Sequence, residues 1–280
     1  MPFEPRDIMK RVGMVGTLPT LPGVARKLIA MVEEDHVSVQ EIGRLIASDQ
    51  VISARVLKIV NSAFYGFPGR ISTIRHALVL VGFNVVKGLV LSASVVDMMT
   101  KGMSGLWEHS LGVALASACV ARRINEPDPE EAAVAGLLHD LGKVILSVGL
   151  TDVFAEATAE RDKRRSSLFE AERAVMGGLS HADVGAWLAR EWNLPVRLRE
   201  AIEHHHAPSH ARFEPRLVSI VHVGNAIIHG LDFGFAGDRL VPPLEMSALP
   251  RLGLTWPDLP PLIDTIERML EATDVSDFAL

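Results

Sequence analysis

The stretch EEAAVAGLLHDLGKVILSVG, residues 130–149, decides the fold class and points to the chemistry. Its long apolar run predicts one buried helix. Within that helix His139 and Asp140 stand side by side, and Lys143 follows four residues after the histidine on the same face. A base, an acid and a cation in a buried helix indicate a metal site for phosphate chemistry, or the remnant of one. The pair alone is a weak signal, because two adjacent letters recur often by chance.

The rest of the chain also predicts helices. Ser38 and Glu41 have the spacing of a capping box, in which the two residues cap a helix start reciprocally. Asp49 is expected to cap the next helix, where apolar residues repeat at helical spacing over residues 52–60. No stretch alternates apolar and polar residues with the turn signals expected of strands. The sequence therefore predicts an all-α fold.

The composition changes near residue 102, because nine of the eleven histidines follow it. We expect an N-terminal helical lobe, residues 1–102, with little ionisable chemistry. A His-rich helical lobe, residues 103–280, should follow. The separating segment KGMSG, residues 101–105, is short. The two lobes are therefore expected to pack together in one bundle rather than to hang on a flexible linker.

Length and composition predict a globular cytoplasmic protein of one or two domains. The single cysteine allows no intramolecular disulfide, and the N-terminus has no apolar core of a signal peptide. Residues 77–99 are apolar enough to suggest a membrane span, but Asn84 and Lys87 lie near their middle. A charge at mid-bilayer is costly. We therefore expect two buried helices broken at Gly82, and no membrane partner.

The charge argues against a nucleic-acid partner. The net charge is −6, and the sequence pI is about 6.0. The only dense basic cluster is RDKRR, residues 161–165, which is flanked by acidic residues. Such a cluster is more typical of a solvated helix end or loop. A chain with this charge does not naturally approach a polyanion.

Histidine and aspartate together can bind a borderline metal such as zinc, iron or manganese. Side chains of His139 and Asp140 can converge on one ion or on two neighbouring ions, while Lys143 holds a phosphate oxygen. The run EHHHAP, residues 203–208, has a second interpretation. It also fits a helix end in water, where the helix dipole favours histidine.

The order of these pieces resembles the HD superfamily of metal-dependent phosphohydrolases. A single histidine, HD-x-GK about 30 residues later, another histidine and an HH pair follow one another. The first lobe resembles the HDOD (HD-related output domain) group, which is related to the HD-GYP proteins. It does so at LPTLPGVARKL (18–28), ASDQVISARVLKIVNSAFYG (47–66) and ISTIRHALVLVGFNVVKGLVLS (71–92). This resemblance implies an all-α fold in two packed lobes, the second of HD type.

The resemblance also implies a ligand set. Where the family has two aspartates late in the chain, this sequence reads VHVGNA, so His222 and Asn225 occupy those slots. A neutral ligand there would weaken the hold on a hard dication. The implied metal ligands are His109, His139, Asp140, His181, His205, His206 and His222, with Lys143 as the implied catalytic lysine.

The family's activity is expected only in part. No GYP loop follows the HH pair, which argues against hydrolysis of cyclic di-GMP, the activity that goes with that loop. We expect a bacterial signal-transduction module that contacts a signalling protein or a nucleotide-type ligand, with a retained site for one or two Fe, Mn or Zn ions. The alternative is a metal-dependent phosphohydrolase with a dinuclear centre. The oligomeric state is left open.

The most specific part of the first-lobe resemblance is NSAFYG, residues 61–66. We expect Asn61 and Ser62 to end their helix by bonding free carbonyls. Tyr65, the only tyrosine, should pack between the lobes with its hydroxyl bonded. A signalling surface is the alternative interpretation of this motif.

Overall fold

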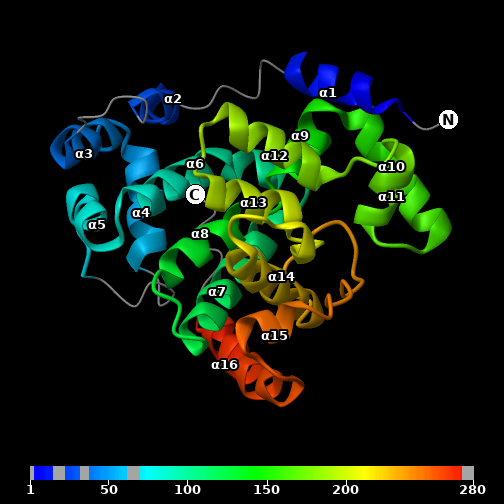
Figure 1. Cartoon of the computed structure of the whole chain (residues 1–280). Coiled ribbons are helices and arrows are strands. Elements are labelled where there is room, and N and C mark those ends of the chain that lie inside the picture. Colours follow the sequence, from blue (N-terminus) through cyan, green and yellow to red (C-terminus); the bar gives the residue numbers. More distant parts are fainter. Residues whose placement is uncertain (1–2, 15–22, 32–37, 62–69, 273–280) are drawn as a thin grey trace.

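The computed structural model describes residues 3–14, 23–31, 38–61 and 70–272, and within these ranges every regular element is a helix (Figure 1). The all-α prediction is confirmed. The first elements are α1 (Pro5–Met14), α2 (Gly23–Met31), α3 (Val39–Ala47), α4 (Gln50–Asn61), α5 (Ile74–Val81) and α6 (Phe83–Gly102). Next come α7 (Leu106–Arg123), α8 (Pro129–Leu138), α9 (Leu141–Gly149), α10 (Thr151–Arg164) and α11 (Leu168–Val175). The chain continues with α12 (His181–Glu191), α13 (Val196–His204), α14 (Pro215–Gly230), α15 (Ala248–Leu252) and α16 (Leu259–Glu271), and with short 3₁₀ turns at Pro208–His210 and Trp256–Asp258.

Helix α7 is the centre of the bundle. It is buried along nearly its whole length and packs most extensively against α8 and α14. The approach to α8 is close at Gly136, where a Cβ would lie 2.7 Å from the carbonyl oxygen of Val113. The smaller group α2–α5 lies at one side of this bundle, and α6 connects the two (Figure 1).

Helix α1 belongs spatially with the later helices. The amide of Phe3 donates to the carbonyl oxygen of Val175 at 2.7 Å, and Arg11 pairs with Asp152 of α10 at 2.6 Å. The first element of the chain therefore packs on α10 and the end of α11, away from α2–α5 (Figure 1). The domain division at residue 102 stays a prediction, although α6 ends at Gly102.

The local capping signals are confirmed. Ser38 and Glu41 form a reciprocal capping box at the start of α3. The Asp49 carboxylate accepts the amides of Val51 and Ile52 at the start of α4. At the end of α4 the Asn61 side chain donates to the carbonyl of Leu57, as expected for a residue that ends a helix. Ser62 and Tyr65 lie outside the described residues.

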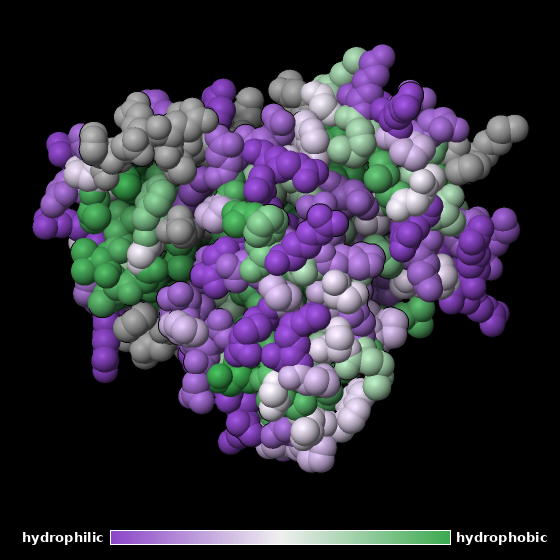
Figure 2. Space-filling view, viewed as in Figure 1, coloured by the Kyte–Doolittle hydropathy of each residue, from purple (hydrophilic) through white to green (hydrophobic). Residues whose placement is uncertain are grey.

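Residues 77–99 form two helices of the bundle, α5 and α6, which meet at Gly82 with φ of +82°. Another stretch, Pro129–Gly149, is long and apolar enough to cross a membrane, but 89% of it is buried inside the protein. That burial is typical of core helices. On the outer face of α5, Val79 and Leu80 are exposed, and Figure 2 shows an apolar area over this helix at the left of the view.

The prediction of one helix over residues 130–149 is wrong. Helix α8 ends at Leu138 and α9 begins at Leu141, with His139 and Asp140 in the turn between them. Asp140 has φ −96° and ψ +15°, outside the helical region. The turn frees the backbone carbonyl of Gly136, which bonds the ring of His139 at 2.7 Å. The tertiary surroundings therefore override the helical pattern at the HD pair.

Lys87 predicts a pH dependence of stability. Its side chain is 1% exposed, its ammonium donates to the carbonyl oxygen of Asn193 at 2.8 Å, and burial lowers its pKa from 10.5 to about 8. Between these two values the unfolded chain binds more protons than the folded one, so the free energy of unfolding should rise with pH, by up to about 3 kcal/mol. Urea unfolding at pH 8 and pH 10 measures this. The rise should be absent from Lys87→Met, and an equal rise in both proteins would contradict the assignment.

Candidate metal centre

Six of the seven predicted ligands come together from four parts of the bundle. His109 lies one turn into α7, and His139 and Asp140 lie in the turn between α8 and α9. The other three lie at the start of α12 and just after α13. They form two groups in which the ligand atoms lie within 4.8 Å of one another: the first triad is His109, His139 and Asp140, and the second triad is His181, His205 and His206.

The carboxylate of Asp140 lies between the two triads. Its Oδ2 atom is 3.2 Å from Nε2 of His139 and 3.8 Å from Nε2 of His109. Its Oδ1 atom is 3.2 Å from Nε2 of His181 and 3.7 Å from Nε2 of His205. One carboxylate therefore faces four imidazoles, with one oxygen for each triad, as a bridging ligand between two ions would.

In three of these histidines the ring nitrogen that faces away from Asp140, Nδ1, is hydrogen-bonded to the protein. Nδ1 of His139 bonds the carbonyl of Gly136 at 2.7 Å, and Nδ1 of His205 bonds the carbonyl of Ile202 at 2.8 Å. Nδ1 of His181 bonds the carboxylate of Glu172 at 2.5 Å. Each bond makes Nδ1 the donor, so that in a neutral ring Nε2 carries the lone pair. These lone pairs point toward Asp140.

The Nε2 lone pairs of the histidines and the carboxylate of Asp140 share one small buried space. These electron-rich atoms repel one another unless a cation or a proton lies between them. Nε2 of His139 and Oδ1 of Asp140 are buried and have no hydrogen-bond partner among the described residues. Burial alone would lower the pKa of His181, but the Glu172 and Asp140 carboxylates together outweigh burial and the pKa is raised. The residues fit one or two divalent ions.

Lys143 adds a fixed cation to the cluster, as its spacing from Asp140 predicts. Its ammonium lies 2.8 Å from Oδ2 of Asp140, and both side chains are buried. Burial alone would raise the pKa of Asp140, but His139 and Lys143 outweigh burial and hold that pKa well below its usual value. Burial also keeps the pKa of His109 and of His205 low. Neutral imidazoles and an ionised carboxylate are the forms that bind metal.

His222 is not brought into either triad. Both of its ring nitrogens are bonded inside the protein, Nδ1 to the carbonyl of His205 and Nε2 to the amide of Glu245. Asn225, in the other slot, places Oδ1 3.1 Å from Nε2 of His109 at the edge of the first triad. His229 also lies there, with its ring centroid 4.8 Å from that of His109, and burial lowers its pKa to about 4.

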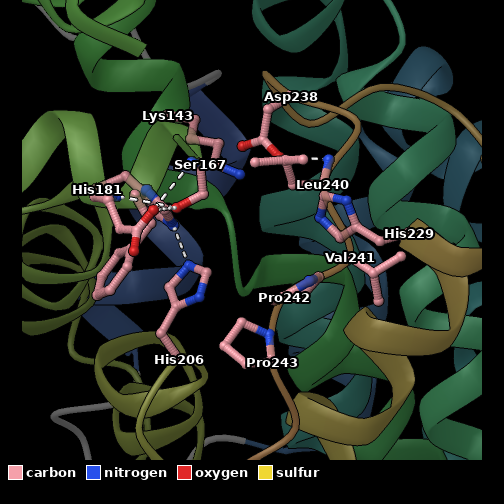
Figure 3. Close-up of a pocket in the computed structure, with 12 residues that line it drawn as sticks. Lys143, Ser167, His181, His206, His229, Asp238, Leu240, Val241, Pro242 and Pro243 are labelled. Carbon is pink, nitrogen blue, oxygen red and sulfur yellow. Dashed lines mark hydrogen bonds between the residues drawn. The ribbon is translucent and has the colours of Figure 1, made fainter. Parts of the chain in front are cut away.

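A cavity of about 210 Å³ opens beside the second triad (Figure 3). The ring of Phe169 stacks on His206, with centroids 4.0 Å apart and planes at 25°. Leu240, Val241, Pro242 and Pro243 face His206 and His181 from the opposite side in Figure 3. Small ligands that enter would meet histidine and lysine at the floor and apolar groups at one wall. The polar lining consists of Lys143, Ser167, Glu170, His181, His206, His229 and Asp238.

Sequence reasoning missed Glu172 and Phe169. Glu172 is fully buried and accepts both the amide and Nδ1 of His181. Each residue stands nine or more positions before the histidine that it contacts. Nothing in the surrounding letters distinguishes them from ordinary residues of an amphipathic helix.

We expect Glu172→Gln to weaken metal binding. The carboxylate orients His181 and raises its basicity, and loss of such a partner typically costs about 10- to 100-fold in metal affinity. Competition with a chromophoric chelator measures the affinity for Zn²⁺. The matched control is Glu131→Gln, which alters another buried carboxylate, paired with Arg197 at 2.6 Å. An equal affinity loss in both variants would contradict the orienting role of Glu172.

The comparisons with known proteins agree with this architecture. The family model of the HDOD domain matches residues 18–208. A Treponema pallidum protein of uncharacterised function is 27% identical over 223 residues, which are 78% of this chain and 43% of that protein. This chain therefore spans less than half the length of that curated relative.

Two solved structures share the fold. An HDOD domain protein of unknown function from Geobacter sulfurreducens has a TM-score of 0.67 and 27% identity, covering 98% of this chain and 90% of that one. A Marinobacter aquaeolei protein, named as a candidate signal transduction protein, has a TM-score of 0.68 and 19% identity, covering 91% of this chain and 58% of that one. At 19% identity the second likeness shows the fold alone.

Proposed function

The chain belongs to the HDOD family, and from this premise we propose that it is a bacterial signal-transduction module with a divalent metal centre and a ligand pocket in its His-rich lobe. The observation that carries the metal centre is the position of Asp140. Its two carboxylate oxygens lie 3.2–3.8 Å from Nε2 atoms of four histidines. The signalling role rests on the family and on the missing GYP loop.

The donor set favours borderline ions. Five imidazoles surround one carboxylate in the two triads. Nitrogen-rich sites select zinc or iron, while magnesium and calcium prefer oxygen. Manganese lies between these preferences. His109 and His139 would hold one ion and His181, His205 and His206 the other, with Asp140 between them.

The pocket suits a small phosphate-bearing ligand. When bound, the ions supply positive charge that attracts and polarises a phosphate oxygen. Lys143 lines the same cavity and can donate to a second oxygen of that group. The Phe169 ring and the apolar wall from Leu240 to Pro243 offer contact area to the rest of the ligand. A nucleotide-type ligand has this combination of a charged and an apolar part.

Metal content is the deciding measurement. We expect one or two equivalents of iron, zinc or manganese in protein purified without a His tag or chelator, measured by elemental mass spectrometry. Calorimetric titration with pyrophosphate should then show binding to the loaded protein and none to the stripped protein. A folded protein that holds no metal and takes up none would refute the centre. The search would then turn to protein partners by affinity purification.

Hydrolysis is the second candidate, and the placement of Lys143 favours it. The ammonium is fixed by Asp140 and lines the cavity. There it would stabilise the charge that develops on phosphate oxygens while water forms the new P–O bond and the ester oxygen leaves. Phosphomonoesters and phosphodiesters should be screened with loaded protein. Replacing His139 and Asp140 together should abolish turnover without unfolding the chain, and turnover that survives would refute the mechanism.

A further inference from the structure

His222 joins three parts of the site that are distant in the sequence. It lies in α14 and is 2% exposed. Its Nδ1–H donates to the carbonyl oxygen of His205 at 2.7 Å, and its Nε2 accepts the amide of Glu245 at 2.9 Å. His205 is a member of the second triad, and Glu245 follows the apolar wall of the cavity. One neutral ring therefore ties the main chain of a triad residue to the main chain of that wall.

The wall is part of what we name the covering segment, residues 238–245. Its first residue is also fixed, because Oδ2 of Asp238 accepts the amide of Leu168 at 2.7 Å. At its last residue the Glu245 carboxylate accepts the amide of Ser209 at 3.2 Å. Leu240, Val241, Pro242 and Pro243 lie between these ties and line the cavity. The covering segment is thus held at both ends, and its second end is held on the turn that carries the HH pair.

The bonding of His222 leaves no lone pair for an ion. A ligand histidine must present one unprotonated nitrogen to the metal. Here one nitrogen carries the proton given to His205, and the lone pair of the other is taken by Glu245. Liberating Nε2 would leave the amide at the part-buried end of the covering segment without its partner, which costs stability.

We propose that His222 is a positioning residue rather than a metal ligand, and that it couples the second triad to the covering segment. The proposal rests on the metal centre of the proposed function. The same His222 ring hydrogen-bonds both the carbonyl of His205 and the amide of Glu245, and so fixes the position of both. A change at His222 should therefore alter both metal binding by the second triad and hydrogen exchange of the covering segment.

Two conservative variants separate the two bonds. An asparagine amide nitrogen can take the place of Nδ1, so His222→Asn keeps the bond to His205 and loses the bond to Glu245. Glutamine reaches the place of Nε2, so His222→Gln keeps a bond to Glu245 and loses the bond to His205. Glu245→Pro is a third variant: it removes the amide donor and also the carboxylate that accepts the amide of Ser209, so it releases the whole second end of the covering segment without touching α14. It keeps the test open if a change at His222 prevents folding.

Two readouts test the proposal. Hydrogen exchange of peptides covering residues 238–245, measured without metal, should be about 10-fold faster in His222→Asn, as expected for a lost hydrogen bond of about 1.4 kcal/mol. It should be faster still in Glu245→Pro, which also loses the bond from Ser209. It should be nearly unchanged in His222→Gln. Zinc affinity should fall about 10-fold in His222→Gln, where His205 is released, and less in His222→Asn.

X-ray absorption of the zinc-loaded proteins counts imidazole ligands directly. The count should be the same in wild type and in both His222 variants. A loss of one imidazole in both His222 variants would show that His222 is a ligand. An unchanged exchange rate in His222→Asn would show that the bond between His222 and Glu245 does not hold the covering segment. Either result overturns the proposal. Failure of the wild type to bind zinc would instead refute the metal centre. The exchange data would still test whether His222 holds the covering segment.

Discussion

Replacing Asp140 with asparagine should reduce the metal content from about two equivalents to nearly none. This carboxylate is the only acid in the two triads, and it contacts both. An amide keeps the shape and removes the negative charge that offsets two dications and Lys143. Loss of one charged ligand from each ion should cost well over 100-fold in affinity for both, more than the loss of an outer-shell partner. Elemental mass spectrometry after dialysis against a fixed, low concentration of free zinc measures the change.

Two controls give this result its meaning. Asp238→Asn makes the same chemical change at the cavity rim, where the carboxylate only accepts backbone amides, and should leave metal content at the wild-type value. His206→Asn should lose one equivalent and keep the other, because it alters the second triad alone. If Asp140→Asn lost no more metal than His206→Asn, the bridging position would be wrong. The double variant Asp140→Asn with Lys143→Met avoids leaving the lysine buried and unpaired, and should be equally metal-free.

Replacing Gly142 with alanine should destabilise the protein by about 3 kcal/mol or more. A Cβ at this position would lie 1.8 Å from the carbonyl oxygen of His181 and 2.7 Å from the amide of Gly185. Both neighbours are backbone atoms of α12, so no side chain can turn aside. Helices α9 and α12 would have to separate, which moves His181 away from Asp140. Chemical denaturation gives the free energy of unfolding, and zinc competition gives the accompanying loss of affinity.

Gly43 supplies the matched control. It lies inside α3, and a Cβ there would meet nothing closer than 3.6 Å, the ordinary contact distance, at the side chain of Arg75. Gly43→Ala should therefore stabilise the protein by about 0.5–1 kcal/mol, because alanine is the better helix former. If both alanine variants changed the stability equally, the close approach of α9 and α12 would not be the cause.

The helices and their starts were predictable because their signals are local. Ser38 and Glu41 are three residues apart, and the bonds of their capping box form within one turn. The same holds for Asp49 and the first amides of α4. Six of the seven residues expected as ligands lie together in the structure, and the resemblance that singled them out depends on their order in the chain. That resemblance indicated which positions carry ligand-type residues, but it gave no distances between them.

The turn at the HD pair could not be predicted, because its causes lie elsewhere in the chain. Apolar residues continue through residues 130–149, so periodicity favours one helix. In the structure α8 ends at Leu138, and His139 and Asp140 lie in a turn where they meet side chains of α7, of α12 and of the residues just after α13. Glu172 was missed for the same reason, since its partner His181 is defined only by packing.

By itself the sequence determined the helical class, the helix starts and the residue types available for a metal site, because each depends on spacing within a few residues. Tertiary structure alone decided which side chains meet. It placed Asp140 between the two triads, put Glu172 behind His181, and bonded both ring nitrogens of His222 to the main chain. The physical reason is that ligation and orienting bonds join residues up to 116 positions apart, as His109 and Asn225 are. Only packing sets distances over such separations.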